Sequence, residues 1–127
     1  MHYRITKETR PNLKNYGRYK AVAVHYDTVD TERLCQQIQN NCTLKKSDVK
    51  AVLSELSELL KMHLQEGNRI RLDGIGLLKL EIESDKVERP EDFNVRRHIR
   101  NFRLHLLPES IDGHQALYEG IHLEPAP

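Results

Sequence analysis

One long amphipathic segment, residues 45–66, constrains the fold of this chain more than any other feature. Its apolar residues recur at helical spacing and fall on a single stripe about 120° wide. The stripe consists of Val49, Val52, Leu53, Leu56, Leu60 and Leu64. Gly67 follows at the position where a glycine commonly ends a helix. The sequence therefore predicts a long helix with one apolar face and one solvated face.

The rest of the chain offers little apolar material to cover that face. Its 127 residues have the size of one domain, but only 38% are hydrophobic, 6% are aromatic and none is Trp. We therefore expect a second chain to bury part of the apolar surface. The expected dimer core is the helical stripe together with Leu78 and Leu80.

Composition and spacing also exclude several classes of protein. No apolar run approaches 18 residues and the N-terminus lacks an apolar signal segment, so we expect neither a membrane protein nor an exported one. Cys35 and Cys42 would lie about 10 Å apart on a helix, too far for a disulfide, and we expect both to be small packing residues in a reduced, cytoplasmic protein. We find no catalytic set and no histidines at ligand spacing, so we expect no enzyme, metal, cofactor or small-molecule substrate.

Shorter elements are predicted before the long helix. Residues 19–26 are rich in β-branched and aromatic residues and predict a strand, for which residues 3–6 are the candidate antiparallel partner. A short helix is expected over residues 31–39, after a helix-start signal at residues 28–30.

Strands are predicted after the long helix. Residues 69–73 and 78–82 alternate with period two around Gly74 and Gly76, which predicts a strand, a glycine turn and a second strand. Another strand is expected to run through residues 102–106 to Pro108. A short helix over residues 109–118 and an irregular tail complete the chain.

Charge is segregated within this region, although the net charge of the chain is only +1. Residues 81–92 carry six acids and two bases, whereas residues 94–105 carry four arginines and no acid. The four are Arg96, Arg97, Arg100 and Arg103. They are candidate phosphate contacts, or they pair across the strands with the facing acids. On strand alternation, Arg97 and Arg103 share one face and Arg96 and Arg100 the other, so one pair can face DNA while the other forms ion pairs.

Several motifs occur in an order that resembles one known family. Residues 72–78 (Leu-Asp-Gly-Ile-Gly-Leu-Leu) resemble the Gly-Phe-Gly-x-Phe turn of the bacterial histone-like family, which includes HU and integration host factor. Residues 44–49 resemble the start of that family's second helix, and residues 106–108 resemble the Phe-Lys-Pro before its last helix. The resemblance covers about residues 28–120, which leaves an extension with a candidate hairpin at 1–27 and a tail at 121–127.

A divergent branch of the family with an N-terminal extension is similar in further places. The matching segments are residues 19–22, 28–34 and 90–93. The resemblance implies an α+β fold, an intertwined homodimer with a helical base, a three-stranded sheet and a β-ribbon arm. It also implies architectural, weakly sequence-specific binding and bending of double-stranded DNA in the cytoplasmic nucleoid.

The DNA-binding residues that we expect are the ribbon arginines and further residues of the turn and of the long helix. These further residues are Lys45, Lys46, Arg71, Gly74, Gly76, Lys79 and Arg89. Other interpretations stay open: a solvated helix face for the lysines, a purely steric turn for the glycines, and either an arm or a soluble tail for the basic residues of 7–20.

The sequence departs from the family pattern in its charge. Typical members are strongly basic, and residues 88–92 (Glu-Arg-Pro-Glu-Asp) replace a basic arm tip. Pro90 lies near the position of the residue that wedges between bases, but the acids beside it would be repelled by phosphates. The competing hypothesis is a dimeric structural or protein-interaction module of HU-like fold that has lost strong DNA binding.

Overall fold

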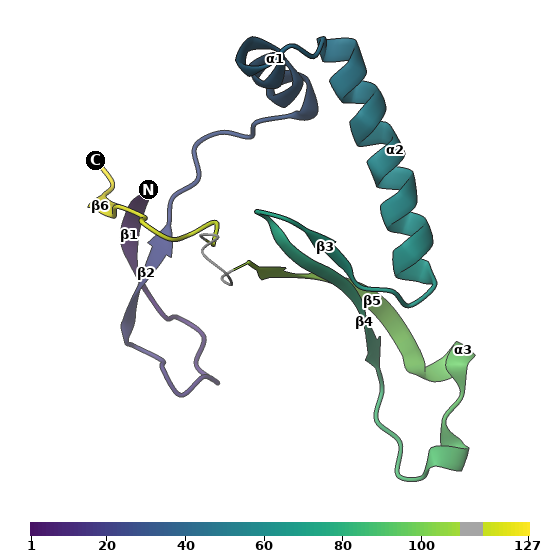
Figure 1. The fold of residues 1–127 in the computed structure, drawn as a ribbon. Helices are drawn as coiled ribbons and strands as arrows, with labels where there is room; N and C mark the ends of the chain where they lie inside the picture. Colours follow the sequence, from purple (N-terminus) through teal and green to yellow (C-terminus); the bar gives the residue numbers. More distant parts are fainter. Residues whose placement is uncertain (110–115) are drawn as a thin grey trace.

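The computed structural model describes residues 1–109 and 116–127, and in this part the chain is α+β with two separate three-stranded sheets (Figure 1). One sheet has the order β2-β1-β6, from β1 (His2–Lys7), β2 (Tyr19–Ala23) and β6 (Glu124–Pro125). The other has the order β3-β4-β5, from β3 (Ile70–Leu72), β4 (Gly76–Ser84) and β5 (Ile99–Pro108). The helices are α1 (Thr31–Asn41), α2 (Lys46–Gln65), the 3₁₀ turn η1 (Pro90–Asp92) and α3 (Val95–His98).

Side-chain caps set the bounds of the two main helices. The Asp30 carboxylate accepts a hydrogen bond of 2.9 Å from the backbone N–H of Arg33, which starts α1 where the sequence predicts it. The backbone N–H of Lys46 donates to Oε1 of Gln39 at 2.6 Å, so the end of α1 caps the start of α2. Gly67, with φ +88°, follows the end of α2 as predicted.

The predicted strand, glycine turn and strand are confirmed, and Gly76 shows why a glycine is needed. Its φ is +150°, and a Cβ added there would lie 2.2 Å from the carbonyl oxygen of Leu107 on the neighbouring strand β5. No side chain fits that approach, so Gly76 sets how closely β4 and β5 can pair.

The N-terminal hairpin is confirmed, and the tail is more ordered than expected. Strands β1 and β2 pair antiparallel, from Tyr3 opposite Ala23 to Lys7 opposite Tyr19. Within the tail expected to be irregular, β6 pairs in parallel with β1 and brings the two ends of the chain together (Figure 1). The hairpin is therefore one part of a three-stranded sheet.

Two other expectations need correction. Residues 95–98 form α3 instead of a strand, because the Asn94 side chain caps a helical turn there. Cys35 is fully buried as expected, but Cys42 is exposed, and its Sγ donates to the carbonyl of Ile38 at 3.1 Å. Of the helix expected over residues 109–118, residues 110–115 lie outside the described residues, and residues 117 and 118 belong to a turn.

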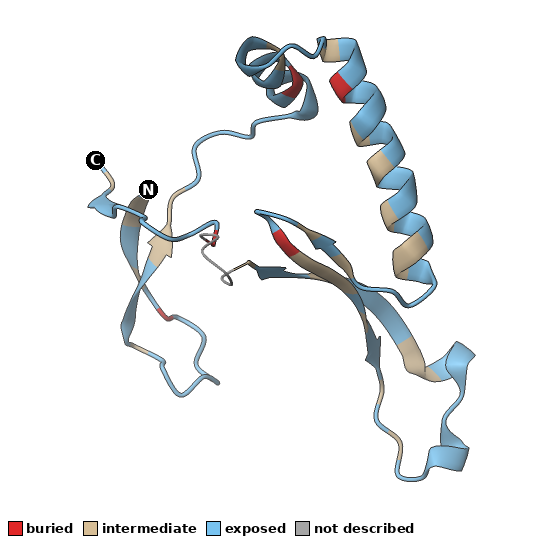
Figure 2. Ribbon diagram, viewed as in Figure 1, coloured by how far each residue is buried: buried red, intermediate tan, exposed pale blue. Residues whose placement is uncertain are grey.

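The expected dimer core lies largely open in the single chain (Figure 2). Val49 is buried, but Val52 is 62% exposed and Leu80 is 38% exposed. The other members are half-buried, namely Leu53, Leu56, Leu60, Leu64 and Leu78. Helix α2 contacts α1, β3 and β4, and these contacts leave its apolar stripe incompletely covered.

Candidate nucleic-acid interface

Strands β4 and β5 form a two-stranded ribbon that runs from Gly76 opposite Pro108 to Ser84 opposite Ile99. An irregularity at Glu83 and Ser84 ends the regular register, and residues 85–98 close the ribbon as its tip (Figure 1). One ribbon face is apolar and carries Leu78, Leu80, Ile82, Phe102, Leu104 and Leu106. The other face is polar and carries Lys79, Glu81, Glu83, Asn101, Arg103 and His105. Directly opposite residues share a face, so this register decides which charges meet.

Glu81 is the centre of the polar ribbon face. Its carboxylate accepts a hydrogen bond of 3.0 Å from Nη2 of Arg103, and it lies 3.4 Å from Nζ of Lys79 and 3.4 Å from Nδ1 of His105. The hydrogen bond from Arg103, followed by that from Lys79, lowers the pKa of Glu81 below its ordinary value. One acid therefore engages two of the cations that we expected to face phosphates.

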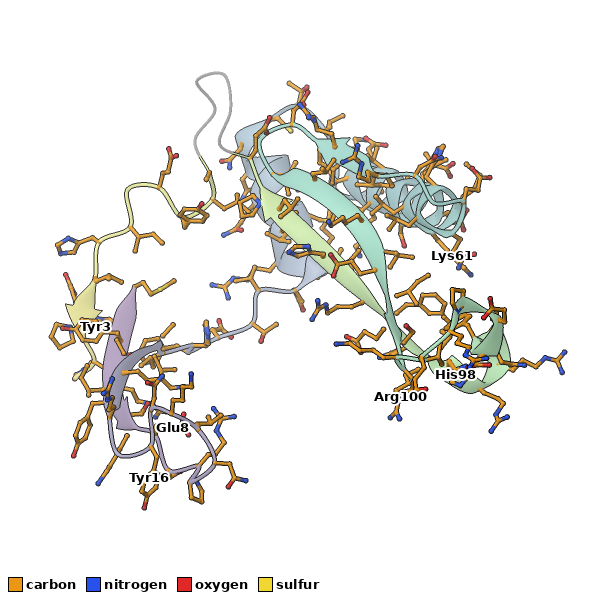
Figure 3. All side chains as sticks on the ribbon, turned by 90° about the horizontal axis from the view of Figure 1, so that it is seen from below. Tyr3, Glu8, Tyr16, Lys61, His98 and Arg100 are labelled. Atoms are coloured by element: carbon orange, nitrogen blue, oxygen red, sulfur yellow. The ribbon has the colours of Figure 1, made fainter. Side chains whose placement is uncertain are left out.

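The remaining ribbon arginines divide into one engaged residue and two open ones. Arg100 pairs with Asp85, which follows β4, and Figure 3 shows Arg100 beside the start of the tip. Arg96 and Arg97 lie in α3, where their backbone N–H groups donate to Oδ1 of Asn94 at 2.9 and 3.2 Å. Their side chains are exposed and form no ion pair with residues 1–109 or 116–127.

The tip is therefore the part of the ribbon in which arginines are exposed and form no ion pair within the described residues. Arg89 is also exposed and precedes η1, which places a third arginine in the tip. Pro90 lies exposed in η1 beside Glu91 and Asp92. Residues 85–98 contain four acids and four bases, so the tip has no net charge as a whole. Its positive charge is confined to the positions of the individual basic side chains.

The residues of the glycine turn are partly engaged within the chain. The backbone N–H of Gly74 donates to Oε2 of Glu109, so a carboxylate already occupies this donor. Arg71 is exposed on β3 and lies opposite Leu77. The predicted phosphate contact through the Gly74 N–H would require Glu109 to move away.

The lysines at the start of α2 lie at the opposite end of that helix from the ribbon (Figure 1). Lys46 and Lys50 both pair with Glu32 of α1, and the hydrogen bonds from Lys46 and then Lys50 lower the pKa of Glu32 to about 2. Lys45 is exposed and precedes the helix. In one chain, the expected DNA-binding residues therefore do not form a single continuous surface.

Sequence reasoning missed the role of Glu81 as a shared partner. Lys79 was expected to add charge at the turn, but it contacts the acid two residues along its own strand. The available signal was the alternation itself, since Lys79, Glu81 and Glu83 occupy one face of a strand.

Other chemistries find no support in the described part of the chain. No group of three or more His, Cys, Asp or Glu residues there could hold a metal ion. None of the helices in these ranges combines the length and the apolar character needed to cross a membrane.

A helix pair followed by a three-stranded sheet with a long two-stranded ribbon is compatible with an HU-like domain. The family model HU-HIG, described as "HU domain fused to wHTH, Ig, or Glycine-rich motif", matches residues 1–112, and the chain belongs to this family. At the level of the family, the role is an HU-like architectural one with DNA as the partner, and its members are generally non-enzymatic. The match includes the first 27 residues, which the sequence alone set apart as an extension. No curated protein that was compared with the chain matches it.

Proposed function

We propose that the protein binds and bends double-stranded DNA as an architectural homodimer with little sequence preference, on the nucleoid in the cytoplasm. The observation that carries this proposal is the ribbon tip, where Arg89, Arg96 and Arg97 are exposed at the end of the paired strands β4 and β5. Cations at such a position suit phosphate contacts along a groove, which are insensitive to base sequence.

The surface that one chain leaves open supports the proposed homodimer. The chain exposes 11197 Å², whereas a compact monomer of 14.9 kDa exposes about 7000 Å². The excess of roughly 4000 Å² per chain is more than the roughly 1000–2500 Å² that each partner of an obligate dimer commonly buries, so one chain leaves ample surface for a second copy. The apolar stripe of α2 and the apolar ribbon face supply the surface that a second copy would cover, and the dimer would carry two ribbon arms.

Bending would come from two arms that hold one duplex. Pro90 is the candidate wedge, because it is exposed in η1 within the tip. Glu91 and Asp92 beside it oppose a close approach to phosphates, so we assign most of the affinity to the arginines and not to Pro90.

The competing function is a dimeric interaction module of the same fold without strong DNA binding. It is favoured by the acids that engage Lys79, Arg100 and Arg103 on the ribbon. The two functions differ in whether phosphate contacts contribute measurably to a duplex complex.

A salt titration of duplex binding with two matched variants tests the proposal. We expect Arg96→Ala/Arg97→Ala to flatten the slope of log affinity against log salt by up to about 1.8 for each arm that binds, or about 3.6 for the dimer, because each lost phosphate contact removes about 0.9. Arg100→Ala/Arg103→Ala removes the same charge from the same ribbon, but from residues already paired with acids, and should change the slope less. Energy transfer between dyes at the two ends of a short duplex reports bending.

Two results would contradict the proposal. If the unmodified protein does not bind duplex DNA at about 50 mM salt, the interaction module is the better function. If it binds and both double variants have the unmodified slope, the DNA lies on another surface.

A further inference from the structure

The positive charge of the protein is concentrated at its N-terminus. Residues 1–26 carry six Lys and Arg and one acid, Glu8, for a net charge of +5. Residues 27–127 carry 14 Lys and Arg and 18 Asp and Glu, for a net charge of −4. The part of the chain with the ribbon and helices is thus acidic as a whole, and the N-terminal hairpin is basic.

This basic segment is an ordered hairpin and not a loose tail. Strands β1 and β2 pair along five residue positions, and β6 pairs with the other edge of β1. At the base of the connecting loop, the backbone N–H of Glu8 donates to the carbonyl of Arg18 at 2.8 Å, and the N–H of Gly17 donates to the carbonyl of Glu8 at 3.0 Å. The loop between residues 8 and 18 is therefore closed by backbone hydrogen bonds.

The Glu8 side chain organises the cations of this loop (Figure 3). It is only 9% exposed, and its carboxylate accepts hydrogen bonds from Nε and Nη2 of Arg10 at 2.9 and 3.1 Å. Nζ of Lys20 lies 3.7 Å away. These contacts, with the Arg10 hydrogen bond as the largest cause, lower the pKa of Glu8 to about 2. Glu8 therefore stays ionised and keeps two cations together.

The cations keep free donors that face solvent. Arg10 gives two of its five N–H groups to the Glu8 side chain, so three remain, and its side chain is 69% exposed. Arg10, Arg18 and Lys20 line a hollow of about 380 Å³ together with Glu8, Leu13, Asn15 and Tyr19. Three cations against one neutralising carboxylate leave this hollow cationic, which suits a phosphate group.

We propose that the loop of the N-terminal hairpin is a second phosphate-binding surface, separate from the ribbon tip, and that it binds the backbone of duplex DNA. The inference rests on the proposed function only in taking duplex DNA as the ligand. The hairpin residues are distinct from the ribbon residues, so each surface can fail independently.

The surroundings of Tyr19 favour a duplex backbone over stacked single-stranded bases. Nζ of Lys7 lies 6.0 Å from the centre of the Tyr19 ring, so a cation already engages this ring. Single-strand binding proteins instead present aromatic rings on which successive bases stack. The loop also exposes Tyr16, but its cations outnumber the exposed rings Tyr16 and Tyr19. These cations are Arg10, Lys14, Arg18 and Lys20. We therefore assign the loop to the charge of the backbone, which a duplex presents without exposing its bases.

The test compares two double variants of the full chain with equal loss of charge. Lys14→Gln/Arg18→Gln removes two exposed cations from the hairpin loop, neither of which binds Glu8 through its side chain among the described contacts. Lys61→Gln/Arg33→Gln removes one exposed lysine from α2 and one exposed arginine from α1, both outside the hairpin and the ribbon, as the matched control. Far-UV circular dichroism confirms that both variants remain folded.

We expect the hairpin variant to flatten the salt slope for a duplex by up to about 1.8 for each chain that binds, and to do so also in an Arg96→Ala/Arg97→Ala background. The matched control should have the unmodified slope. An equal slope in both variants overturns the proposal, and so does a loss seen only with a single-stranded oligonucleotide of the same length. If the ribbon variant has no effect while the hairpin variant does, the ribbon assignment fails and the hairpin assignment is supported.

Discussion

The clearest test of the ribbon electrostatics is Glu81→Gln. This change removes the carboxylate that engages Arg103 at 3.0 Å and Lys79 at 3.4 Å, while it keeps the size and shape of the side chain. If acids on the ribbon limit DNA binding, the variant should bind duplex DNA more tightly than the unmodified protein. The reason is that a released cation can contact a phosphate and that one negative charge is lost.

The size of the effect follows from counterion release. One additional phosphate contact steepens the slope of log affinity against log salt by about 0.9. If the two proteins bind equally at about 1 M salt, the variant then binds about 15-fold more tightly at 50 mM salt and about 4-fold more tightly at 200 mM. Arg103 also lies 3.9 Å from Glu83, so we expect about one new contact for each ribbon that binds, not two. Fluorescence polarisation with a labelled duplex at four or more salt concentrations, on the order of 50 to 200 mM, resolves this change.

Glu83→Gln is the matched control. It removes the same charge from the same strand and face, but Glu83 contacts Arg103 only at 3.9 Å and does not contact Lys79. We expect a smaller change for this variant. Equal tightening in the two variants would show that overall charge, and not release of a cation from Glu81, is responsible. No change in either variant would show that the polar ribbon face does not meet DNA.

Three further predictions concern assembly, pH and the turn. Leu56→Asp should convert the proposed dimer into a monomer in light scattering, at a cost of several kcal/mol for an unpaired buried charge. Ser54→Asp on the solvated face should leave the dimer intact. A folded monomer of the unmodified protein would contradict this prediction. The pKa of Glu8 falls from 4.5 to about 2 on folding, so the contribution of its carboxylate to the stability of the folded protein is complete above pH 4.5 and is lost as the pH falls towards 2. Glu8→Gln should abolish that part of the acid dependence in thermal melts. Gly76→Ala should lower the free energy of unfolding by about 3 kcal/mol, because of backbone strain and a clash with the neighbouring strand. Gly74→Ala meets no atom within 4 Å and should cost only about 1–2 kcal/mol in urea unfolding.

Elements with a local cause were predictable from the sequence. The apolar stripe and Gly67 define α2, Asp30 starts α1, and Gly74 with Gly76 predicts the turn between β3 and β4. In each case a side-chain pattern or a glycine acts on its own neighbours along the chain. The α+β class and the HU-like family followed from the order of these elements.

Features that depend on long-range pairing were not predictable. The parallel pairing of His2 with Glu124 joins residues from opposite ends of the chain, and no local signal marks a two-residue strand. Asn94 starts a helical turn where the alternation of the neighbouring residues favours a strand, and the choice depends on where the ribbon stops. The expectation that Arg96 and Arg97 occupy opposite ribbon faces failed for this reason.

The location of charge, and not its total, governs how this protein can meet a polyanion. Along the regular ribbon, Glu81 and Asp85 neutralise the cations that would otherwise track a phosphate backbone. Exposed cations gather at two places in the described chain, the ribbon tip with Arg96 and Arg97 and the N-terminal loop around Glu8, while Lys45, Lys61 and Arg71 are exposed singly elsewhere. A duplex held at these two places would make few phosphate contacts per chain. The expected salt dependence is therefore shallower than for a uniformly basic arm, although the fold is the same.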